Sequence, residues 1–505
     1  MRLNKDNLPS IIETSQLHKP TANVDVLPEK VLQFGTGVLL RALPDFIINT
    51  ANNNNIFNGQ VVVVKSTSVG NTDAFTEQDS LYTVCVRGIQ DGINVAENNI
   101  VSSISRVLSA TSEWDEILEC ATNSEMQIII SNTTEVGLEL VQDDIFQNPP
   151  TSFPGKLLAF LHYRYNYFNG DINKGMIIIP TELLPDNGKI LSSIVFELAH
   201  QNNLDTAFIN WLINSNYFCS SLVDRIVPGK MPSAEQEIIE KEIGYMDELM
   251  IVSEPYYLWA IESDNEKVKN ILSFANGNDK VIIAPNINKF RELKLRLLNG
   301  SHTFSCGLAY LAGFTTVKEA MDNNLFANYI SQLMFTEIIP SICSAEIDKQ
   351  EAESFAHNVI DRFKNEFIEH KWLSISMQYS SKMATRNVFV IEQFLIHFKA
   401  SPLKMALGMA AHILFMKGEE GADGKYYGFA NQQQYWINDN NAAFYSTAWK
   451  QEHIDSVVTT ILSNENIWQT NLSSLTEFKT VVIKWLKILM DEGAKSALVM
   501  IKNNN

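Results

Sequence analysis

One short stretch of the chain, Lys294-Leu-Arg-Leu-Leu-Asn299-Gly-Ser-His302, contains three side chains suited to alcohol and carbonyl chemistry. At about 100° per residue, Asn299 lies about 140° from Lys294 around a helix and His302 about 80° from it, so the three share one broad face. A lysine whose pKa is lowered by burial can remove or return a hydroxyl proton. An asparagine amide can donate to a developing alkoxide, which is typically worth about 10²–10³ in rate, and a histidine can orient a neighbouring hydroxyl.

The same stretch also has a purely structural interpretation. Lys294 belongs to a basic series with Lys289, Arg291 and Arg296, which could form a solvated helix face. His302 could equally be a core histidine whose polar atoms are satisfied by hydrogen bonds. Spacing alone leaves both interpretations open.

A glycine turn is the second candidate site. It consists of Phe34, Gly35, Thr36 and Gly37. It follows an apolar run from Val31 and precedes a helical pattern, an arrangement in which glycines let the backbone approach a pyrophosphate at a helix N-terminus. The third glycine of the G-x-G-x-x-G pattern is replaced by Leu40, and other strand-to-helix turns also use two glycines. Arg41 could reach a phosphate or be a surface arginine.

The residue that follows the second strand bears on the choice between NAD and NADP. Dinucleotide sites that select NAD carry an acidic residue there, which holds the ribose 2′-hydroxyl. Here the run Val61–Val64 is followed by Lys65-Ser66-Thr67, and a lysine would tolerate a 2′-phosphate. These residues alone therefore leave the cofactor open.

The elements that would position the glycine turn alternate between strand and helix. Strand-like runs are expected at 31–34, 61–64, 126–131 and 176–180, and helices at 112–122 and 154–166. Continuous apolar strands between helices are typical of a parallel sheet covered on both faces. The sequence predicts an α/β, Rossmann-type dinucleotide-binding domain with a parallel-sheet core over residues 1–286.

The second half of the chain has a helical pattern almost throughout. Apolar residues recur at intervals of three and four at 294–312, 327–339, 351–363, 388–398 and 475–490, and strand-like runs are nearly absent. Residues 287–505 are therefore predicted to form a mostly α-helical domain that carries the substrate and catalytic residues.

Composition excludes several classes of function. The 505 residues include 39 Lys and Arg against 58 Asp and Glu, a formal net charge of −19, which disfavours binding to nucleic acid or anionic membrane. The apolar stretch 403–416 is too short to span a bilayer and is predicted to be a buried helix. Because the opening MRLNKDNLPS lacks an apolar core, no secretory signal is expected, and the expected compartment is the cytoplasm.

Metal and nucleophile chemistry have no support in the motifs. The five cysteines lie far apart without a C-x-x-C pair, and no HExxH, G-x-S-x-G or Walker-type motif occurs. We therefore expect no metal cofactor. We expect a small-molecule substrate that reacts with a dinucleotide cofactor and with side chains of the protein.

Taken together, the motifs give the chain a family resemblance. The shared features, in chain order, are Gln33-Phe-Gly-Thr-Gly37 with Arg41, Ser131-Asn-Thr-Thr-Glu-Val-Gly137, Asn187-Gly188, Leu222-Val-Asp-Arg-Ile226, Glu254-Pro-Tyr-Tyr-Leu-Trp-Ala-Ile-Glu262, the set Lys294, Asn299 and His302, Arg362-Phe-Lys-Asn365, and Ser381-Lys382. The chain resembles the zinc-independent, long-chain polyol dehydrogenases of the mannitol dehydrogenase family, and within it the hexuronate branch. The K-x₄-N-x₂-H set and the E-P-x₃-W-x-I-E run are specific when they occur together in this order.

The resemblance implies an NAD-dependent oxidoreductase with its active site between a Rossmann-type domain and a helical domain. In the family, the lysine matching Lys294 is the general acid and base, and the asparagine matching Asn299 stabilises the oxyanion. His302 and Lys382 match substrate-binding positions, and Phe34 to Gly37 with Arg41 match the cofactor site.

Two departures from the family pattern bear on the substrate. Leu183 stands where mannitol dehydrogenases carry a second amide, and Ser374 stands where they carry a substrate-contacting arginine. Both departures fit a different substrate, and a uronate carboxylate would suit Arg386 or Lys382. The resemblance to the hexuronate branch implies interconversion of D-tagaturonate and D-altronate with NAD(H). The alternatives are fructuronate/mannonate or mannitol/fructose, and a non-catalytic sensor on the same scaffold.

Overall fold

The structure is a computed structural model that describes residues 1–22, 26–67, 72–133 and 135–503. Thr134, inside the motif that begins at Ser131, lies outside these residues, as do Asn504 and Asn505. The described chain forms two compact units, Met1–Arg87 with Asn94–Ile287, and Gly88–Ile93 with Asn288–Asn505. The assignment of a cofactor role to residues 1–286 and a substrate role to residues 287–505 stays a prediction.

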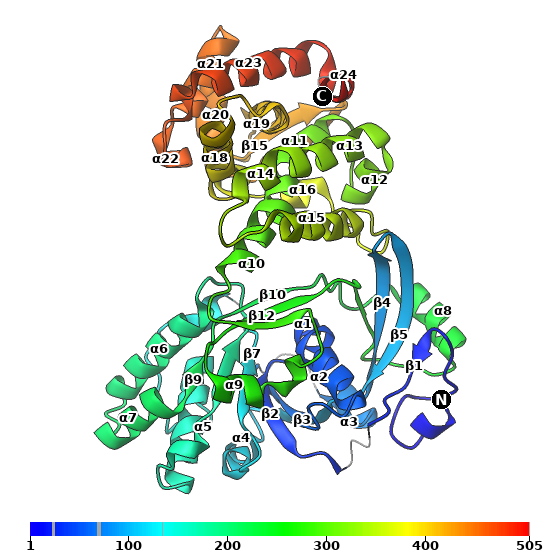
Figure 1. The fold of residues 1–505 in the computed structure, drawn as a ribbon, viewed down its shortest axis with the longest axis vertical. Helices are drawn as coiled ribbons and strands as arrows, with labels where there is room; N and C mark the ends of the chain where they lie inside the picture. Colours follow the sequence, from blue (N-terminus) through cyan, green and yellow to red (C-terminus); the bar gives the residue numbers. More distant parts are fainter. Residues whose placement is uncertain (23–25, 68–71, 134, 504–505) are drawn as a thin grey trace. The chain divides into compact units, whose positions relative to one another are not determined.

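A six-stranded sheet in which every pair of neighbouring strands is parallel forms the centre of the first unit (Figure 1). Its strands are β2 Glu29–Phe34, β3 Gln60–Lys65, β6 Ile104–Ser109, β7 Ile128–Ser131, β8 Ile177–Pro180 and β9 Tyr217–Phe218. The order across the sheet is β6-β3-β2-β7-β8-β9, which is the order of Rossmann folds. The predicted fold of this half is confirmed.

Helices cover both faces of this sheet, which explains the unbroken valine and isoleucine runs. Val61 and Val63 pack on one face with Ile47 of α2 (Pro44–Asn53). Val62 and Val64 pack on the opposite face, against α4 Trp114–Glu119, α5 Phe153–Tyr167, α6 Asn187–Gln201 and α7 Thr206–Ser215. Figure 1 shows α5, α6 and α7 together on that side. Successive side chains of a strand point to opposite faces, so both must be apolar here.

Two smaller sheets of the first unit were not predicted. One has the strand order β1-β5-β4-β11, made of Leu17–His18, Ile93–Val101, Tyr82–Gln90 and Ile251–Ser253. The other has the order β10-β12-β13, made of Ser221–Asp224, Leu258–Glu262 and Val281–Ala284. β4, β12 and β13 are apolar runs like those of the predicted strands and were overlooked, whereas β5 has a largely polar sequence and β1, β10 and β11 have only two to four residues.

The second unit is mostly helical, as predicted. Its helices include α10 Asn288–Leu293, α11 Ser301–Leu311, α13 Asn324–Gln332, α15 Lys349–Phe363, α17 Tyr379–Met383, α18 Phe389–Phe398, α19 Leu403–Phe415, α23 Thr476–Asp491 and α24 Gly493–Lys502. Three π-helices interrupt the α-helical pattern, at Lys294–Gly300, Leu333–Ile338 and Ala384–Val388. Such wide turns are rare and occur frequently at functional sites.

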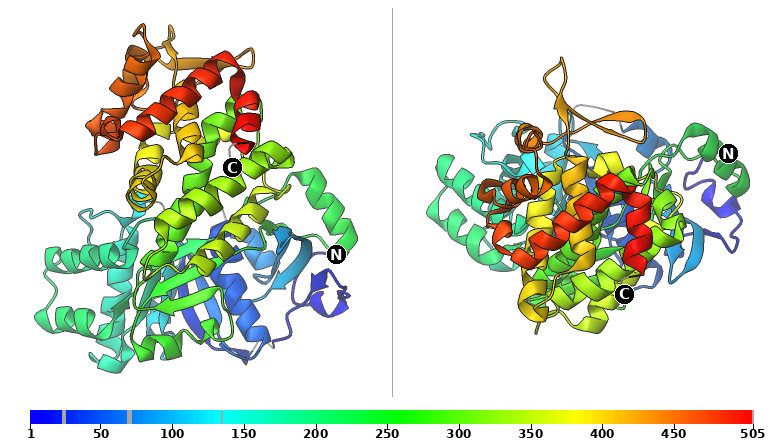
Figure 2. Two further views of the ribbon diagram at one scale, coloured as in Figure 1. Left: turned by 45° about the horizontal axis from the view of Figure 1, so that its top comes forward. Right: turned by 90° about the horizontal axis from the view of Figure 1, so that it is seen from above.

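A small antiparallel sheet in the second unit was not predicted. It consists of β14 Glu419–Glu420, β15 Tyr426–Ala430 and β16 Gln433–Trp436, shown in orange in Figure 2. These strands have two to five residues and include Gly428, so they give no clear alternating signal.

The helix α19 confirms the prediction of a buried helix at 403–416. Almost all of its side chains are buried, and it packs on α11 and α23. The buried carboxylate of Glu337, in the π-helix Leu333–Ile338, accepts hydrogen bonds from the first amides of α19, those of Lys404 and Met405, both at 2.8 Å. Burial raises the pKa of Glu337 to about 7. Among the described helices, none is long and apolar enough to cross a membrane.

Candidate functional site

The glycine turn lies directly after the central strand β2. Gly35 has φ +132°, and its amide donates to the carbonyl of Val64 at 3.0 Å. A Cβ at Gly35 would lie 2.8 Å from Leu40 Cδ1 and 3.3 Å from the carbonyl of Asn132, so no other residue fits. Gly37 precedes α1 (Val38–Ala42), and a Cβ there would meet nothing within 4 Å. The turn therefore combines a fixed first glycine with open space at the second.

This turn also lies where ligands bind in folds of this kind. The strand order reverses between β2 and β7, and ligands of open α/β sheets bind at the carboxyl ends of strands at that point. The buried carboxylate of Glu182 accepts from Ser131 Oγ at 3.2 Å and from the amide of Thr133 at 2.8 Å. Asn132 Nδ2 donates to Thr181 at 3.0 Å, so the loop after β7 is tied to the loop after β8.

A buried amide–carboxyl pair supports the turn from below. Gln33 Nε2 donates to the carbonyl of Gly35 at 3.3 Å and to Asp45 Oδ2 at 3.1 Å. Asp45 is fully buried, and this burial raises its pKa to about 7. The pair links the glycine turn to the first turn of α2.

Arg41 is buried, so the interpretation as a surface arginine is wrong. Its Nη1 donates to the carbonyl of Leu249 at 2.6 Å, and its guanidinium lies 5.8 Å and 5.3 Å from the ring centres of Phe75 and Tyr82. Burial lowers the pKa of Arg41. These contacts favour a structural role, and phosphate binding by Arg41 stays a prediction.

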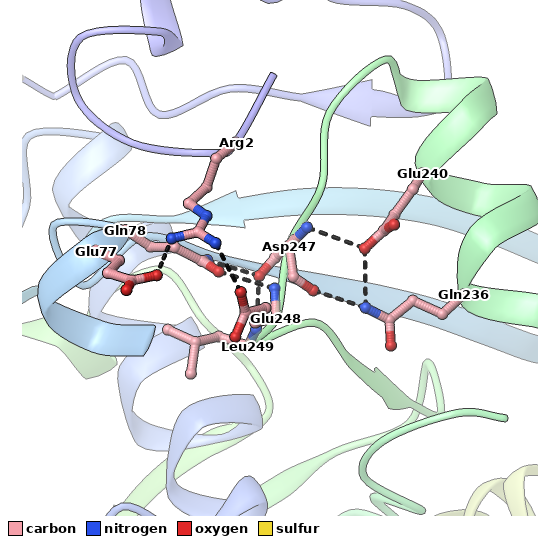
Figure 3. A network of polar contacts seen from close by, with 8 residues as sticks. All are labelled: Arg2, Glu77, Gln78, Gln236, Glu240, Asp247, Glu248 and Leu249. Carbon is pink, nitrogen blue, oxygen red and sulfur yellow. Dashed lines mark hydrogen bonds and ion pairs between the residues drawn. The ribbon is translucent and has the colours of Figure 1, made fainter. Parts of the chain in front are cut away.

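The segment that receives Arg41 is itself held by a polar network (Figure 3). Asp247 is fully buried and accepts from Gln78 Nε2 at 2.8 Å and from the amide of Leu249 at 2.9 Å. Its own amide donates to Glu240 at 3.0 Å, and Arg2 pairs with Glu248 at 2.9 Å. The carbonyl that Arg41 meets is therefore fixed in place.

Lys65 is the last residue of β3, at the position where dinucleotide-binding folds contact the 2′-group of the cofactor ribose. Its side chain is buried, and Nζ donates to the carbonyl of Thr67 in the same loop. Residues 68–71 lie outside the described chain. The choice between NAD and NADP stays open on these contacts.

The Asn187-Gly188 pair joins three parts of the first unit. Asn187 Nδ2 donates to the carbonyls of Pro180, Glu182 and Ser221, at 3.0, 2.9 and 3.1 Å. A Cβ at Gly188 would lie only 2.4 Å from the backbone nitrogen of Ser220, so glycine is required there. This motif is structural, a role that the sequence did not reveal.

The two motifs around Arg225 and Glu254 are also structural. Arg225 is buried and donates to the carbonyls of Glu254, at 3.0 Å, and Ala42. The carboxylate of Glu254 accepts from the amide of Ile226 at 2.6 Å. The carbonyl of Ala42 ends α1, so these motifs fix the helix that follows the glycine turn.

In the second unit, Lys294 and Asn299 are the first and sixth residues of a π-helix. Its backbone bonds join residues five apart, so these two side chains lie one bonded turn from each other. The separation of about 140° predicted for an α-helix is therefore wrong, and the two lie on more nearly the same side. Both are half-buried, and the Asn299 side-chain amide makes no hydrogen bond within the described chain.

His302 lies in the first turn of α11 and is buried. Its ring stacks on Phe363, with centres 4.0 Å apart and 11° between planes, and meets the edge of His370 at 5.1 Å. Burial, together with the charges of His370, Arg362 and Arg386, holds the pKa of His302 well below its usual value. Its Nε2 has no partner among the described residues, so the interpretation as a satisfied core histidine is wrong.

Two cations lie beside this helix. Arg386, in the π-helix Ala384–Val388, donates from Nη1 to Thr303 Oγ1 at 3.1 Å, and that hydroxyl donates to the carbonyl of Asn299 at 2.8 Å. Lys382 Nζ donates to the carbonyl of Ile375 at 3.0 Å. Burial and the charge of Arg386 lower the pKa of Lys382. Within the described chain, both side chains have neutral hydrogen-bond partners, which leaves their charge available to an anion.

The two positions that depart from the family pattern lie on the surface of their units. Leu183 is 64% exposed in the turn after β8, and Ser374 is exposed in α16 (Trp372–Ile375). Among the described residues, no group of three His, Cys, Asp or Glu side chains could hold a metal ion.

Two residues that contact Arg386 or His302 were missed in the sequence, Thr303 and His370. Thr303 links Arg386 to Asn299, and its place next to His302 was the only available signal. His370 gave none, because only the fold brings it to His302.

Comparison with known proteins identifies relatives over nearly the whole chain. Residues 29–272 match the mannitol dehydrogenase Rossmann domain, and residues 286–489 match the mannitol dehydrogenase C-terminal domain. The altronate oxidoreductase of Halalkalibacterium halodurans is 36% identical over 487 residues, covering 94% of each chain. That of Bacillus subtilis is 34% identical over 477 residues, covering 93% of this chain and 95% of its own.

Two solved structures share the fold. Mannitol 2-dehydrogenase of Pseudomonas fluorescens, in a ternary complex with NAD and D-mannitol, aligns over 100% of both chains with a TM-score of 0.68 and 22% identity. A D-sorbitol dehydrogenase in substrate-free form aligns over 99% of this chain and 100% of its own, with a TM-score of 0.78 and 18% identity. The two matched domains and the altronate oxidoreductases that resemble this chain along nearly its whole length show that it is an oxidoreductase belonging to the mannitol dehydrogenase family.

Proposed function

We propose that this enzyme interconverts D-tagaturonate and D-altronate with NAD(H). The observation that carries the proposal is the contact chain from Arg386 through Thr303 to the backbone carbonyl of Asn299, which ties this cation to the helical segment that bears the expected oxyanion donor. A carboxylate-bearing sugar suits such a cation. The relatives at 34–36% identity that are named altronate oxidoreductase support the same substrate pair.

In this proposal the cofactor is held by the glycine turn. Phe34, Gly35, Thr36 and Gly37 would hold the pyrophosphate, because the turn has room at Gly37 and lies at the reversal of strand order. A bound nicotinamide dinucleotide supplies the hydride in reduction and takes it up in oxidation. The NAD in the complex of the Pseudomonas fluorescens relative supports NAD over NADP.

Lys294 is the proposed general acid and base. In reduction its ammonium gives a proton to the oxygen of the former keto group, and in oxidation its neutral amine removes the hydroxyl proton. Asn299 donates its side-chain amide to the oxygen while that oxygen carries negative charge. The π-helical turn supports this pairing, since it brings the two side chains toward one side.

The remaining polar groups would bind the substrate. The Nε2 atom of His302 is buried and without a partner in the described chain, so a substrate hydroxyl would satisfy it. Arg386 and Lys382 would bind the carboxylate, Arg386 through its planar fork. Ser374, in place of the arginine expected in mannitol dehydrogenases, is consistent with a different substrate.

The first test measures the oxidation of NADH by the purified enzyme, with tagaturonate, fructuronate and fructose offered in separate assays. We expect the highest kcat/KM with tagaturonate, and a large loss when NADPH replaces NADH. A preference for fructuronate would keep the fold and Lys294 but change the substrate. Tight NADH binding without turnover of any of the three would favour the sensor.

A further inference from the structure

The two π-helices that bear the proposed site are joined through their backbone carbonyls. Arg296, in the π-helix Lys294–Gly300, donates from Nη1 to the carbonyl of Thr385 at 2.9 Å and to that of Arg386 at 2.7 Å. Where the i→i+4 ladder widens, a buried backbone carbonyl can be satisfied by a side-chain donor. Arg296 supplies such donors to the turn that carries Arg386.

The contact is reciprocal. Asn387, fully buried in the second π-helix, donates from Nδ2 to the carbonyl of Gly300 at the end of the first, at 3.3 Å. A Cβ at Gly300 would lie 2.9 Å from Asn387 Oδ1, so the close approach depends on glycine. Each wide turn therefore satisfies a carbonyl of the other.

The orientation of Arg296 is fixed on every side. Its Nε donates to Glu292 at 2.9 Å, and its guanidinium lies 4.9 Å from the ring centre of Phe389. The side chain is buried. A lysine could keep the charge and one contact, but it lacks the rigid fork that serves two carbonyls and a carboxylate together.

We infer that Arg296 is a positioning residue of the reaction. It acts through Arg386, because it fixes the turn that carries this cation relative to the turn that carries Lys294 and Asn299. The inference rests on the proposed function, in which Arg386 binds the substrate carboxylate. The separation between that cation and the Lys294 amine then sets which sugar acids bring their keto oxygen to the amine.

The variant Arg296→Lys tests this inference with the full-length enzyme. A misplacement of about 1 Å can cost about 10²-fold in rate. We expect kcat/KM for tagaturonate to fall by about 10-fold to 100-fold, while KM for NADH changes by less than about twofold. Turnover of fructose, which lacks a carboxylate, should change far less.

Arg164→Lys is the matched control. Arg164 is also buried, donates to the carbonyls of Lys174, Ala121 and Asn123, and lies over a phenylalanine ring, but it belongs to the first unit. Replacing a purely structural arginine should lower Tm and leave unchanged the tagaturonate-to-fructose ratio, which is the kcat/KM for tagaturonate divided by the kcat/KM for fructose. The same pattern in Arg296→Lys would overturn the inference.

A double-mutant cycle with Arg386→Ala separates this inference from the proposed function. If Arg296 acts through Arg386, Arg296→Lys should add less than about threefold once Arg386 is gone. If the fold-losses of the two single variants multiply fully in the double variant, the inference about Arg296 is overturned, while the proposed function stands. If Arg386→Ala by itself left KM for tagaturonate unchanged, the carboxylate assignment would fall and the inference with it.

The other side of the contact provides a second variant if Arg296→Lys does not fold. Asn387→Ala removes the donor to Gly300 without touching a charged group. It should lower the tagaturonate-to-fructose ratio in the same direction, and an unchanged ratio in a folded Asn387→Ala enzyme would contradict the inference.

Discussion

The Lys294 amine is the group on which the proposed chemistry depends most directly. Replacing it with methionine keeps most of the side-chain volume and removes the proton carrier. We expect kcat to fall by about 10²–10⁴ in both directions, the range typical of general acid–base groups. NADH affinity, measured by fluorescence titration, should change little.

Lys289 provides the control for Lys294, since it belongs to the same basic series. It forms an ion pair with Glu351 at 2.8 Å and has no role in the proposed mechanism. Lys289→Met should keep nearly full activity. Equal losses in the two variants would mean that the basic series acts only as a helix face.

Arg386 separates a uronate from an uncharged sugar. Hydrogen bonds to charged groups are worth about 1.5–3 kcal/mol, so Arg386→Ala should raise KM for tagaturonate by about 10-fold to 100-fold. The KM for fructose should rise far less, because fructose offers no carboxylate. Steady-state kinetics with both substrates measure this, and an equal rise for both would exclude carboxylate binding.

At the scale of elements, the glycine turn makes two opposite predictions. Gly35→Ala forces a side chain onto a residue with φ +132° and against Leu40, so we expect a loss of stability of about 1–3 kcal/mol. Gly37 has φ −63° and open space, so Gly37→Ala should leave Tm unchanged or slightly raised. If the cofactor occupies that space, the same variant should still raise KM for NADH. Calorimetry and NADH kinetics together test both; an unchanged KM for NADH in Gly37→Ala would contradict the cofactor assignment.

The burial of Glu337 beside α19 predicts a dependence of stability on pH. The pKa of Glu337 is raised in the folded protein to about 7, so folding binds a proton that the unfolded chain has lost. This contribution is fully present below the unfolded pKa of about 4.3 and is lost as the pH rises through about 7, with a slope of at most about 1.4 kcal/mol per pH unit. Glu337→Gln should flatten the free energy of unfolding between about pH 4 and pH 7 in urea titrations. An unchanged slope would contradict the assignment.

For the whole molecule, the direction of catalysis should depend on pH through the proton that accompanies the hydride. Oxidation releases one proton with each hydride, and reduction takes one up. We therefore expect the ratio of oxidised to reduced substrate at equilibrium to rise with pH. NADH absorbance at equilibrium over a series of pH values measures this ratio, and an unchanged ratio would exclude the proposed reaction.

Much of the molecule was predictable because its signals are local. The runs at Val61–Val64 and Ile177–Ile179 can only be strands buried on both faces, and the intervening helices then require a parallel sheet. The spacing of three and four likewise predicted α15, α18 and α23 to within a residue or two at each end. The candidate lysine, asparagine and histidine came from side-chain type and order alone.

The features that the sequence did not reveal depend on contacts between distant segments. A π-helix has the residues of an α-helix, so the true relation of Lys294 to Asn299 was invisible. Arg41 and Lys65 are charged residues that the fold buries against carbonyls, which no local pattern signals. The same is true of His302, whose ring the fold buries against Phe363 while its Nε2 has no hydrogen-bond partner among the described residues.

The wide turn that begins at Lys294 has a consequence for how this segment tolerates change in length. It holds one more residue per bonded turn than an α-helix does, so removing a single residue between Lys294 and Asn299 would allow a regular α-helix to form through the segment. After such a deletion Asn299 would still lie one bonded turn from Lys294, and His302 and the later side chains of α11 would keep nearly the same facing, because the residue lost is the extra one that the wide turn accommodates. Among descendants of this gene, a single-codon deletion should therefore be tolerated better between Lys294 and Asn299 than within α11, where it would turn every later side chain by about 100°.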